Sequence, residues 1–358
     1  MKKILFSAYS LDVGGIEKAL VILLNKLQQK DYDITLVLEK KEGIFLNELN
    51  PKIKIITYTP SNDKNVIMRK LKNFTKRVRF LMKYKNKFDF SASFATYSNS
   101  SAFVAREASK NQYLWAHADY LTLFESDIDK MKKFFEEKKY NKFKKIVFVS
   151  KEGKDTFLSV FPGAEKKVEV CNNLIDGKKI NELAQESIDV KKEEIFTFVN
   201  IGRHQECQKK LTRIIESARI LKERGLNFRI LFVGDGEDTQ LYKDMTKKYE
   251  LEEQIKFLGR KQNPYPYFKI ADCVILTSDY EGYPVVFLES MILNKPLITT
   301  KVSDYDEIEG KYGYVTEKDV KDIADKMQKI IEQGYEIKEK FDYKKYNEKI
   351  MKKIEDMF

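Results

Sequence analysis

The sequence is poor in cysteine and histidine, and it has no long hydrophobic run. Its three cysteines are an odd number without close spacing, which indicates reduced thiols in a reducing compartment. With only two histidines there is little material for a metal site, so we expect no bound metal. No apolar run reaches the length of a membrane span, and Met1-Lys2-Lys3 leads straight into a strand pattern instead of a signal peptide. We therefore expect a cytoplasmic protein.

Proline and glycine are also scarce, with 7 and 15 residues, and they form no Pro-rich or Gly/Ser-rich tract. The sequence contains no repeats and no low-complexity segment. A hydrophobic fraction of 42% with 34% charged residues is typical of a soluble globular protein. At 358 residues the chain is long enough for two domains, each with a core of its own.

Basic residues outnumber acidic ones, which gives a net charge of +11 and a pI near 9.1. Such a charge implies an anionic partner, which could be nucleic acid, a phosphorylated substrate or a membrane surface. The imbalance is greatest in residues 64–87, which contain ten Lys or Arg and no Asp or Glu.

An apolar stripe runs through this basic segment and predicts an amphipathic helix, because its members recur at i, i+4, i+7, i+11 and i+14. These members are Ile67, Leu71, Phe74, Val78 and Leu81. Such a helix suits an anionic lipid surface, where each basic residue contributes roughly 1 kcal/mol. The alternative is that the stripe is core and the lysines are its solvated face. We expect no nucleic acid partner, since no binding motif or stacking platform is present. The expected membrane contacts are Arg69, Lys70, Lys72, Lys76, Arg77, Arg79 and Lys83.

Short β-rich runs alternate with helical patterns along the whole chain, as in parallel α/β folds. Strands at 3–8 and 33–38 flank a helix from about Ile16 to Gln29. Residues 177–193 are polar and charged and predict an interdomain linker, after which a second alternation begins at Ile195. Further strands are expected at 88–93, 112–116, 145–149, 231–238 and 255–259, and further helices at 318–334 and 343–358.

Residues 272–300, DCVILTSDYEGYPVVFLESMILNKPLITT, predict a strand, a polar turn, a helix and a second strand. In an open parallel sheet the carboxyl ends of the strands face the ligand. With Pro284 in the first helical turn, Glu281 lies in the loop and Glu289 about a turn and a half into the helix, so both can point at one ligand. The positive end of the helix is a ready phosphate site, with backbone N–H groups from Tyr283, Val285 and Val286.

This pattern, S-x-x-E-G-x-P-x-x-x-x-E, resembles the donor-site motif of the retaining nucleotide-sugar glycosyltransferases of family 4. A Gly-Gly pair before the first helix, a Gly-Arg followed by a lysine six residues after the arginine, and Asn-x-Ile-Asp ending at Asp176 fit the same family. The resemblance covers nearly the whole chain. It implies an α/β protein of the GT-B fold, with two Rossmann-like domains facing across a cleft. The implied parts are an acceptor-binding domain at 1–176, a nucleotide-sugar-binding domain at 177–341, and a C-terminal helix at 342–358 that crosses back to the N-terminal domain.

The resemblance also implies roles for single residues. Glu289 would hold ribose hydroxyls and Glu281 hydroxyls of the donor sugar, while cations would neutralise the leaving diphosphate. His117, which follows the strand at 112–116, would lie beside the donor sugar as a neutral imidazole. Lys210 competes with Lys209 for contact with the diphosphate, because the glycine that usually follows this lysine is absent. We thus expect catalytic roles for His117 and Glu281, and donor contacts from Gly15, Arg203, Lys209, Glu281, Tyr283, Val285, Val286 and Glu289.

Three functions fit these observations. The first is a metal-independent retaining glycosyltransferase on the inner face of the cell membrane, moving a hexose-type sugar to a membrane-linked or saccharide acceptor in cell-surface polysaccharide or glycolipid synthesis. Its nucleotide diphosphate sugar is the donor substrate, and no cofactor is expected. The second is another GT-B enzyme, such as a nucleotide-sugar epimerase. The third is a noncatalytic protein that binds anionic surfaces through residues 64–87.

Overall fold

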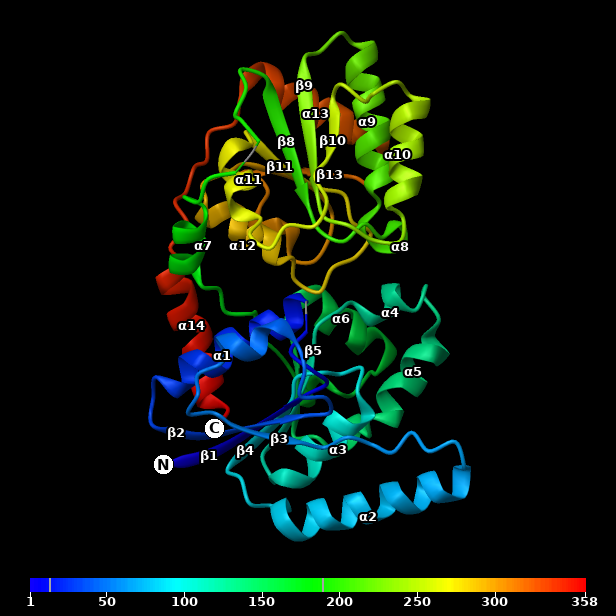
Figure 1. The fold of residues 1–358 in the computed structure, drawn as a ribbon, viewed down its shortest axis with the longest axis vertical. Coiled ribbons are helices and arrows are strands. Elements are labelled where there is room, and N and C mark those ends of the chain that lie inside the picture. The colour runs from blue at the N-terminus through cyan, green and yellow to red at the C-terminus, as the bar shows by residue number, and fades with distance from the viewer. Residues whose placement is uncertain (13, 189) are drawn as a thin grey trace. The chain divides into compact units, whose positions relative to one another are not determined.

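The computed structural model describes residues 1–12, 14–188 and 190–358, which divide into two compact units. Unit 1 comprises Met1–Ile175 and Tyr346–Phe358, and unit 2 comprises Asp176–Lys345. Each unit is a parallel sheet with helices on its faces (Figure 1).

Unit 1 is built on a seven-stranded sheet in the order β3-β2-β1-β4-β5-β6-β7. Its core forms because the strands are short apolar runs, and the helices between them bury apolar stripes against the sheet. The strands are β1 (Lys2–Ala8), β2 (Tyr32–Leu38), β3 (Lys54–Thr57), β4 (Phe90–Ser93), β5 (Gln112–Ala116), β6 (Lys145–Phe148) and β7 (Val168–Val170). The helices are α1 (Gly15–Gln28), α2 (Val66–Tyr84), α3 (Asn99–Ala108), α4 (Tyr120–Leu123), α5 (Ile128–Glu137) and α6 (Lys151–Val160).

The end of the chain completes unit 1. Helix α14 (Tyr343–Asp356) leads to Phe358, whose ring centroid lies 4.6 Å from that of Phe90 and 5.4 Å from that of Tyr32. The hydroxyl of Tyr346 donates to the carbonyl of Asn173 at 3.0 Å. Aromatic contacts with β2 and β4 therefore hold the C-terminal residues against the sheet of unit 1.

Unit 2 is built on a six-stranded parallel sheet in the order β10-β9-β8-β11-β12-β13. Apolar side chains of α9 and α13 cover one face of this sheet. The strands are β8 (Phe196–Ile201), β9 (Phe228–Val233), β10 (Ile255–Phe257), β11 (Cys273–Leu276), β12 (Leu297–Thr300) and β13 (Gly313–Thr316). The helices are α7 (Gly177–Leu183), α8 (Glu206–Lys209), α9 (Leu211–Glu223), α10 (Thr239–Lys248), α11 (Tyr265–Ile270), α12 (Val285–Ile292) and α13 (Val320–Gln333).

The interpretation of residues 177–193 as a linker is wrong for its first part. Residues 177–183 form α7. Asp176 caps this helix, because its carboxylate accepts from the N–H of Lys179 at 3.1 Å. Gly177 and Ile180 are buried, and a Cβ on Gly177 would lie 2.4 Å from the ring of Tyr343. The polar composition of this segment is therefore that of the exposed face of a helix in unit 2. Strands β3 and β13 were also not predicted from the sequence.

Candidate active site

The candidate site lies at the carboxyl edge of the sheet of unit 2. The strand order runs one way from β8 through β9 to β10 and the other way from β11 through β12 to β13. The loops that follow β8 and β11 therefore flank the point where the order reverses, which is where open α/β sheets bind ligands. The first of these segments carries Arg203 and Lys209, the last residue of α8, and the second carries Glu281.

Lys209 and Glu281 form a largely buried ion pair at this point. The ammonium of Lys209 donates to Oε1 of Glu281 at 2.6 Å, and the hydroxyl of Ser278 donates to the same oxygen at 2.6 Å. The side chains of Lys209 and Glu281 are only 19% and 9% exposed. The side-chain amide of Gln208 donates to the carbonyl of Tyr280 at 3.2 Å and reaches the second carboxylate oxygen of Glu281 at 3.5 Å. Glu281 is thus fixed in position before any ligand arrives.

The loop that follows β8 packs closely against its surroundings at Gly202 and Gly234, where a side chain would meet neighbouring atoms. A Cβ on Gly202 would lie 3.8 Å from Cε of Lys209, so the lysine stem runs beside this glycine. Gly234 has φ +155°, and a Cβ there would lie 1.8 Å from the carbonyl oxygen of Gly202. Any other residue at Gly234 would push apart the loops that follow β8 and β9. Arg203, directly after Gly202, is exposed.

Lys210 lies differently from Lys209, although the two are adjacent. Its backbone is left-handed, with φ 51° and ψ 47°, and its carbonyl accepts from the hydroxyl of Thr277 at 2.9 Å. Its ammonium lies 3.8 Å from carboxylate oxygens of Glu206 and Asp279. The geometry therefore places Lys209, and not Lys210, against Glu281.

Helix α12 begins at Val285, directly after Pro284, and carries Glu289 on a buried face. Glu289 is 7% exposed, and Oε1 accepts from the hydroxyl of Tyr265 at 3.0 Å. The N–H groups of Val285 and Val286 lie in the first helical turn, where helix geometry provides no internal acceptor. Tyr283 is buried, and its hydroxyl donates to Glu307 at 2.9 Å.

Three residues at this site were missed by the sequence analysis: Gln208, Tyr265 and Ser303. Ser303 donates from its hydroxyl to the carbonyl of Gly282, so the loop after β12 holds the loop after β11. Gln208 lies between Arg203 and Lys209 at a position that the motif leaves open, and Ser303 stands in a stretch without a motif, so no pattern in the sequence predicts them. Tyr265 follows Asn263-Pro264, which marks a helix start, but its contact with Glu289 spans 24 residues.

In unit 1, Gly15 is the first residue of α1 and follows Gly14, whose backbone is extended. A Cβ on Gly15 would have no other described atom within 4 Å. The backbone at this helix start is therefore accessible to a ligand, as anion binding at a helix N-terminus requires.

His117 follows β5 and lies against Phe94, with ring centroids 4.5 Å apart. Both ring nitrogens are shielded from solvent and make no hydrogen bond within the described ranges. Burial lowers the pKa of His117 to about 3, although the backbone of Phe94 offsets part of this shift. The imidazole is neutral at physiological pH, and its two nitrogens are buried polar atoms without a hydrogen-bond partner among the described residues.

This burial predicts a pH dependence of stability. An unfolded histidine titrates near pH 6.5, so below that pH His117 is protonated in the unfolded chain but not in the folded protein. Stability is therefore lost as the pH falls, by about 2 kcal/mol between pH 6.5 and 5. Fluorescence of Trp115, the single tryptophan, reports on unit 1 during denaturant unfolding. The His117→Asn variant should show a shallower pH dependence than the parent, and equal slopes would contradict the prediction.

Helix α2 turns much of its apolar stripe to solvent. Ile67, Leu71 and Phe74 are 77%, 55% and 64% exposed. Phe80, which the stripe does not include, is 5% exposed and makes the contact with the core of unit 1. The alternative in which the stripe is core is therefore wrong for these three residues, and Met82, 73% exposed, extends the apolar face. Val78 and Leu81 are partly buried.

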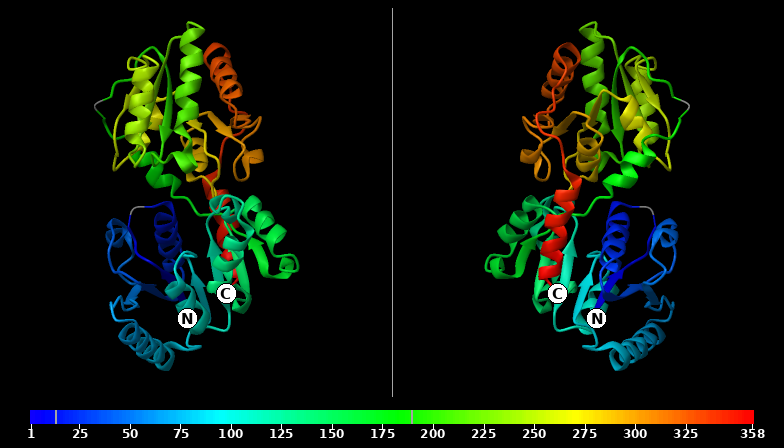
Figure 2. Two further views of the ribbon diagram at one scale, coloured as in Figure 1. Left: turned by 90° about the vertical axis from the view of Figure 1, so that its right-hand side faces the viewer. Right: turned by 90° about the vertical axis from the view of Figure 1, so that its left-hand side faces the viewer.

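The seven basic residues expected to contact a membrane are all exposed. Within the described ranges one of them forms an ion pair, between Lys72 and Asp63 at 2.6 Å. The guanidinium of Arg77 lies over the ring of Phe103, 5.4 Å from its centroid. Among the described helices, none is long and apolar enough to cross a membrane. Figure 2 shows α2 along the outside of unit 1.

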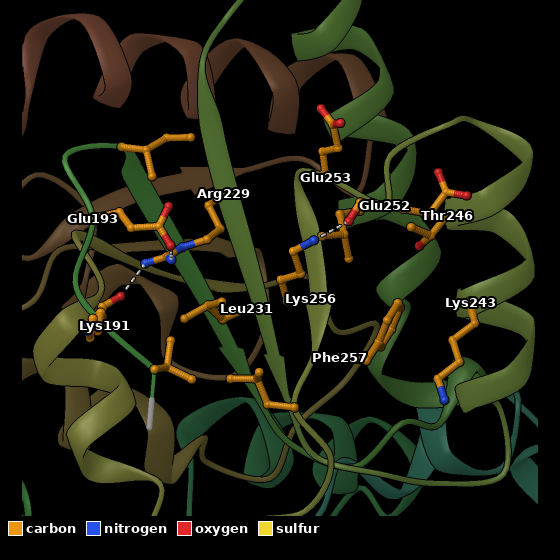
Figure 3. A pocket seen from close by; sticks show the side chains of 14 residues that line it. Lys191, Glu193, Arg229, Leu231, Lys243, Thr246, Glu252, Glu253, Lys256 and Phe257 are labelled. Carbon is orange, nitrogen blue, oxygen red and sulfur yellow. Dashed lines mark hydrogen bonds and ion pairs between the residues drawn. The ribbon is translucent and has the colours of Figure 1, made fainter. Parts of the chain in front are cut away.

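A cavity of about 670 Å³ at β9 and β10 does not belong to the candidate site. Arg229 pairs there with Glu193 and donates to the carbonyl of Lys191 at 3.3 Å, and the ammonium of Lys256 donates to the carbonyl of Glu252 at 2.6 Å (Figure 3). The guanidinium of Arg229 is thus already engaged, and none of the expected site residues lines this cavity.

The two parallel α/β sheets with carboxyl-edge sites are those of the GT-B fold, as the sequence predicts. Residues 179–349 match the model of the family described as glycosyl transferases group 1. The structure of Anabaena HepE in complex with UDP and glucose matches with a TM-score of 0.76 and 18% identity, covering 99% of this chain and 100% of that one. The match to this structure shows the GT-B fold, and the family model covers just under half of the chain.

Two curated relatives extend the comparison. An uncharacterized glycosyltransferase of Methanocaldococcus jannaschii is 28% identical over 200 residues, which is 50% of this chain and 49% of that protein. An N-acetylgalactosaminyltransferase of Campylobacter jejuni that acts on an N-acetylgalactosaminyl-bacillosaminyl-diphospho-undecaprenol is 23% identical over 316 residues, 84% of this chain and 81% of that protein. The chain spans about half or less of the length of the first curated relatives it matches, at 49%, 26% and 47%.

Proposed function

We propose that the protein is a retaining glycosyltransferase that moves a sugar from a nucleotide diphosphate sugar to a saccharide or lipid-linked acceptor in polysaccharide or glycolipid synthesis. The observation that carries the proposal is the cluster of Lys209, Glu281 and Ser278 at the switch point of unit 2. It joins a cation suited to a diphosphate and a fixed carboxylate suited to sugar hydroxyls.

In the proposed reaction the bond from the anomeric carbon to the diphosphate oxygen breaks, and a bond to the acceptor hydroxyl oxygen forms on the same face. The acceptor proton goes to a diphosphate oxygen, so no side chain acts as a nucleophile. Arg203, Lys209 and the amides at Val285 and Val286 stabilise the charge that grows on the diphosphate, and no metal is required. Glu289 holds the ribose hydroxyls.

For unit 1, the resemblance to family 4 implies donor contacts from Gly15 and His117. The open space at Gly15 and the two ring nitrogens of His117 without hydrogen bonds in the described ranges fit these roles. A neutral imidazole can accept from or donate to a sugar hydroxyl without adding charge.

The test is release of nucleoside diphosphate from a panel of uridine and guanosine diphosphate sugars, with and without saccharide and lipid acceptors, in the presence of EDTA. Acceptor-dependent release that is lost in Glu281→Ala supports the proposal. Release or isomerisation without an acceptor identifies an epimerase or hydrolase instead, and no release from any donor leaves the noncatalytic alternative.

We further propose that α2 holds the protein on the anionic inner face of the cell membrane. The exposed apolar residues Ile67, Leu71, Phe74 and Met82 stand on a helix with seven basic residues and no acidic one. Flotation with anionic vesicles, but not with neutral ones, supports this attachment. Leu71→Gln/Phe74→Gln should weaken it about tenfold or more, and Leu241→Gln, an exposed leucine of unit 2, is the control.

A further inference from the structure

A cavity of about 690 Å³ lies in unit 1 between α2 and the edge strand β3. Its walls come from β3 and the residues that follow it, including Thr57 and Thr59, and from one side of α2. Four basic residues line it and no acidic one does: Lys41, Lys76, Arg79 and Lys83.

Among the described residues, three of these four cations have no anionic partner. Within the described ranges Lys41, Arg79 and Lys83 form no ion pair, and the ammonium of Lys83 lies 5.2 Å from the ring centroid of Tyr84. Lys76 is committed, because its ammonium donates to the carbonyl of Thr59 at 2.8 Å and so ties α2 to the end of β3. Like charges held together in a concave surface raise the local concentration of anions.

The cavity and the apolar face of α2 are neighbours on the same helix. Arg79 and Lys83 line the cavity, and Met82, 73% exposed, follows Arg79 by three residues and so stands beside it on the helix. On a helix, residues three and four apart share a side, so Arg79 lies near Lys76 and Lys83 on the side that meets β3. A lipid whose chains lie against Met82 can therefore place its headgroup at the cavity.

We propose that this cavity binds the phosphate headgroup of a membrane lipid, and that it prefers a terminal, doubly charged phosphate to a singly charged phosphodiester. Three unpaired cations attract a doubly charged phosphate more strongly than a singly charged one. Lys and Arg are also the usual partners of phosphate. The hydroxyl of Thr57 adds a hydrogen-bonding group at the end of β3, whereas that of Thr59 already donates to the carbonyl of Glu39. The proposal rests on the membrane attachment proposed above and adds a defined site to it.

The experiment measures binding of the full chain to vesicles of phosphatidylcholine that contain either phosphatidic acid or phosphatidylglycerol, with the two surfaces matched in zeta potential. The parent protein should bind the phosphatidic acid vesicles about fivefold more tightly or better. Arg79→Gln/Lys83→Gln should bring this ratio close to one. The matched control, Arg69→Gln/Lys70→Gln, removes the same charge from α2 but no residue of the cavity, so it should weaken binding to both vesicles and keep the ratio.

Thermal unfolding of each variant checks that the fold is intact. Equal ratios for the cavity pair and the control pair, or no preference in the parent, would overturn the headgroup site while leaving membrane attachment in place. A parent that binds no anionic vesicle would overturn both proposals. Glycerol phosphate in solution is the third ligand tested. If it binds the parent protein as tightly as vesicles do, and Arg79→Gln/Lys83→Gln loses this binding, the site is assigned to a soluble phosphate instead.

Discussion

Replacing Arg203 with alanine is expected to lower the turnover number for donor cleavage by about 100-fold, with little change in the free energy of unfolding. Arg203 is exposed and forms no ion pair within the described ranges, so its removal leaves no buried charge without a partner. Its proposed partner is the charge that develops on the leaving diphosphate. An interaction made mainly in the transition state affects the turnover number more than KM.

The control is Arg219→Ala, which removes an exposed arginine of α9 that pairs with Glu223 in the same unit. This variant should keep both the turnover number and the stability close to parent values. Release of nucleoside diphosphate gives the kinetic constants, and denaturant unfolding gives the free energy. A turnover number for Arg203→Ala within twofold of the parent would falsify the assignment.

Lys209→Ala is expected to lower the free energy of unfolding by about 3 kcal/mol and to abolish most donor cleavage. The loss of stability follows from Glu281, whose carboxylate is 9% exposed and would remain buried without its cation. Lys210→Ala should cost less than about 1 kcal/mol, since its ammonium stands 3.8 Å from two partly exposed carboxylates.

The two lysines are neighbours of equal charge, so each variant is the control for the other. Denaturant unfolding and donor cleavage are measured for both, together with Lys209→Ala/Glu281→Ala. The double variant should recover part of the lost stability, because it leaves no charge alone, but it should not recover activity. Equal effects of the two single variants would contradict the arrangement described above.

Much of unit 2 could be predicted from the sequence because its signals are local. The apolar runs of β11 and β12 and the proline at the start of α12 fix a strand, a turn and a helix within 29 residues. Chain order and the rule for parallel sheets then bring Glu281 to the carboxyl edge. The same reasoning predicted β1, α1 and β2 within a residue or two.

Other features depend on contacts between distant residues, which periodicity does not report. Lys209 and Glu281 are 72 positions apart, so their ion pair was beyond prediction. Helix α2 has apolar residues on two sides, and the pattern alone does not show that Phe80, rather than Phe74, faces the core. In 177–183 the signal was misread, because a short helix with few buried residues has the composition of a linker.

The contact of Phe358 with Phe90 and Tyr32 has a consequence for biosynthesis. Unit 2 is continuous in the chain from Asp176 to Lys345, whereas unit 1 needs residues on both sides of it. During translation, unit 2 can acquire its complete core first, although most of unit 1 has already left the ribosome. All seven strands of unit 1 precede unit 2 in the chain, but the rings of Tyr32 and Phe90 lack their contact with Phe358 until that residue is made, and apolar surface left uncovered in this way is what chaperones bind.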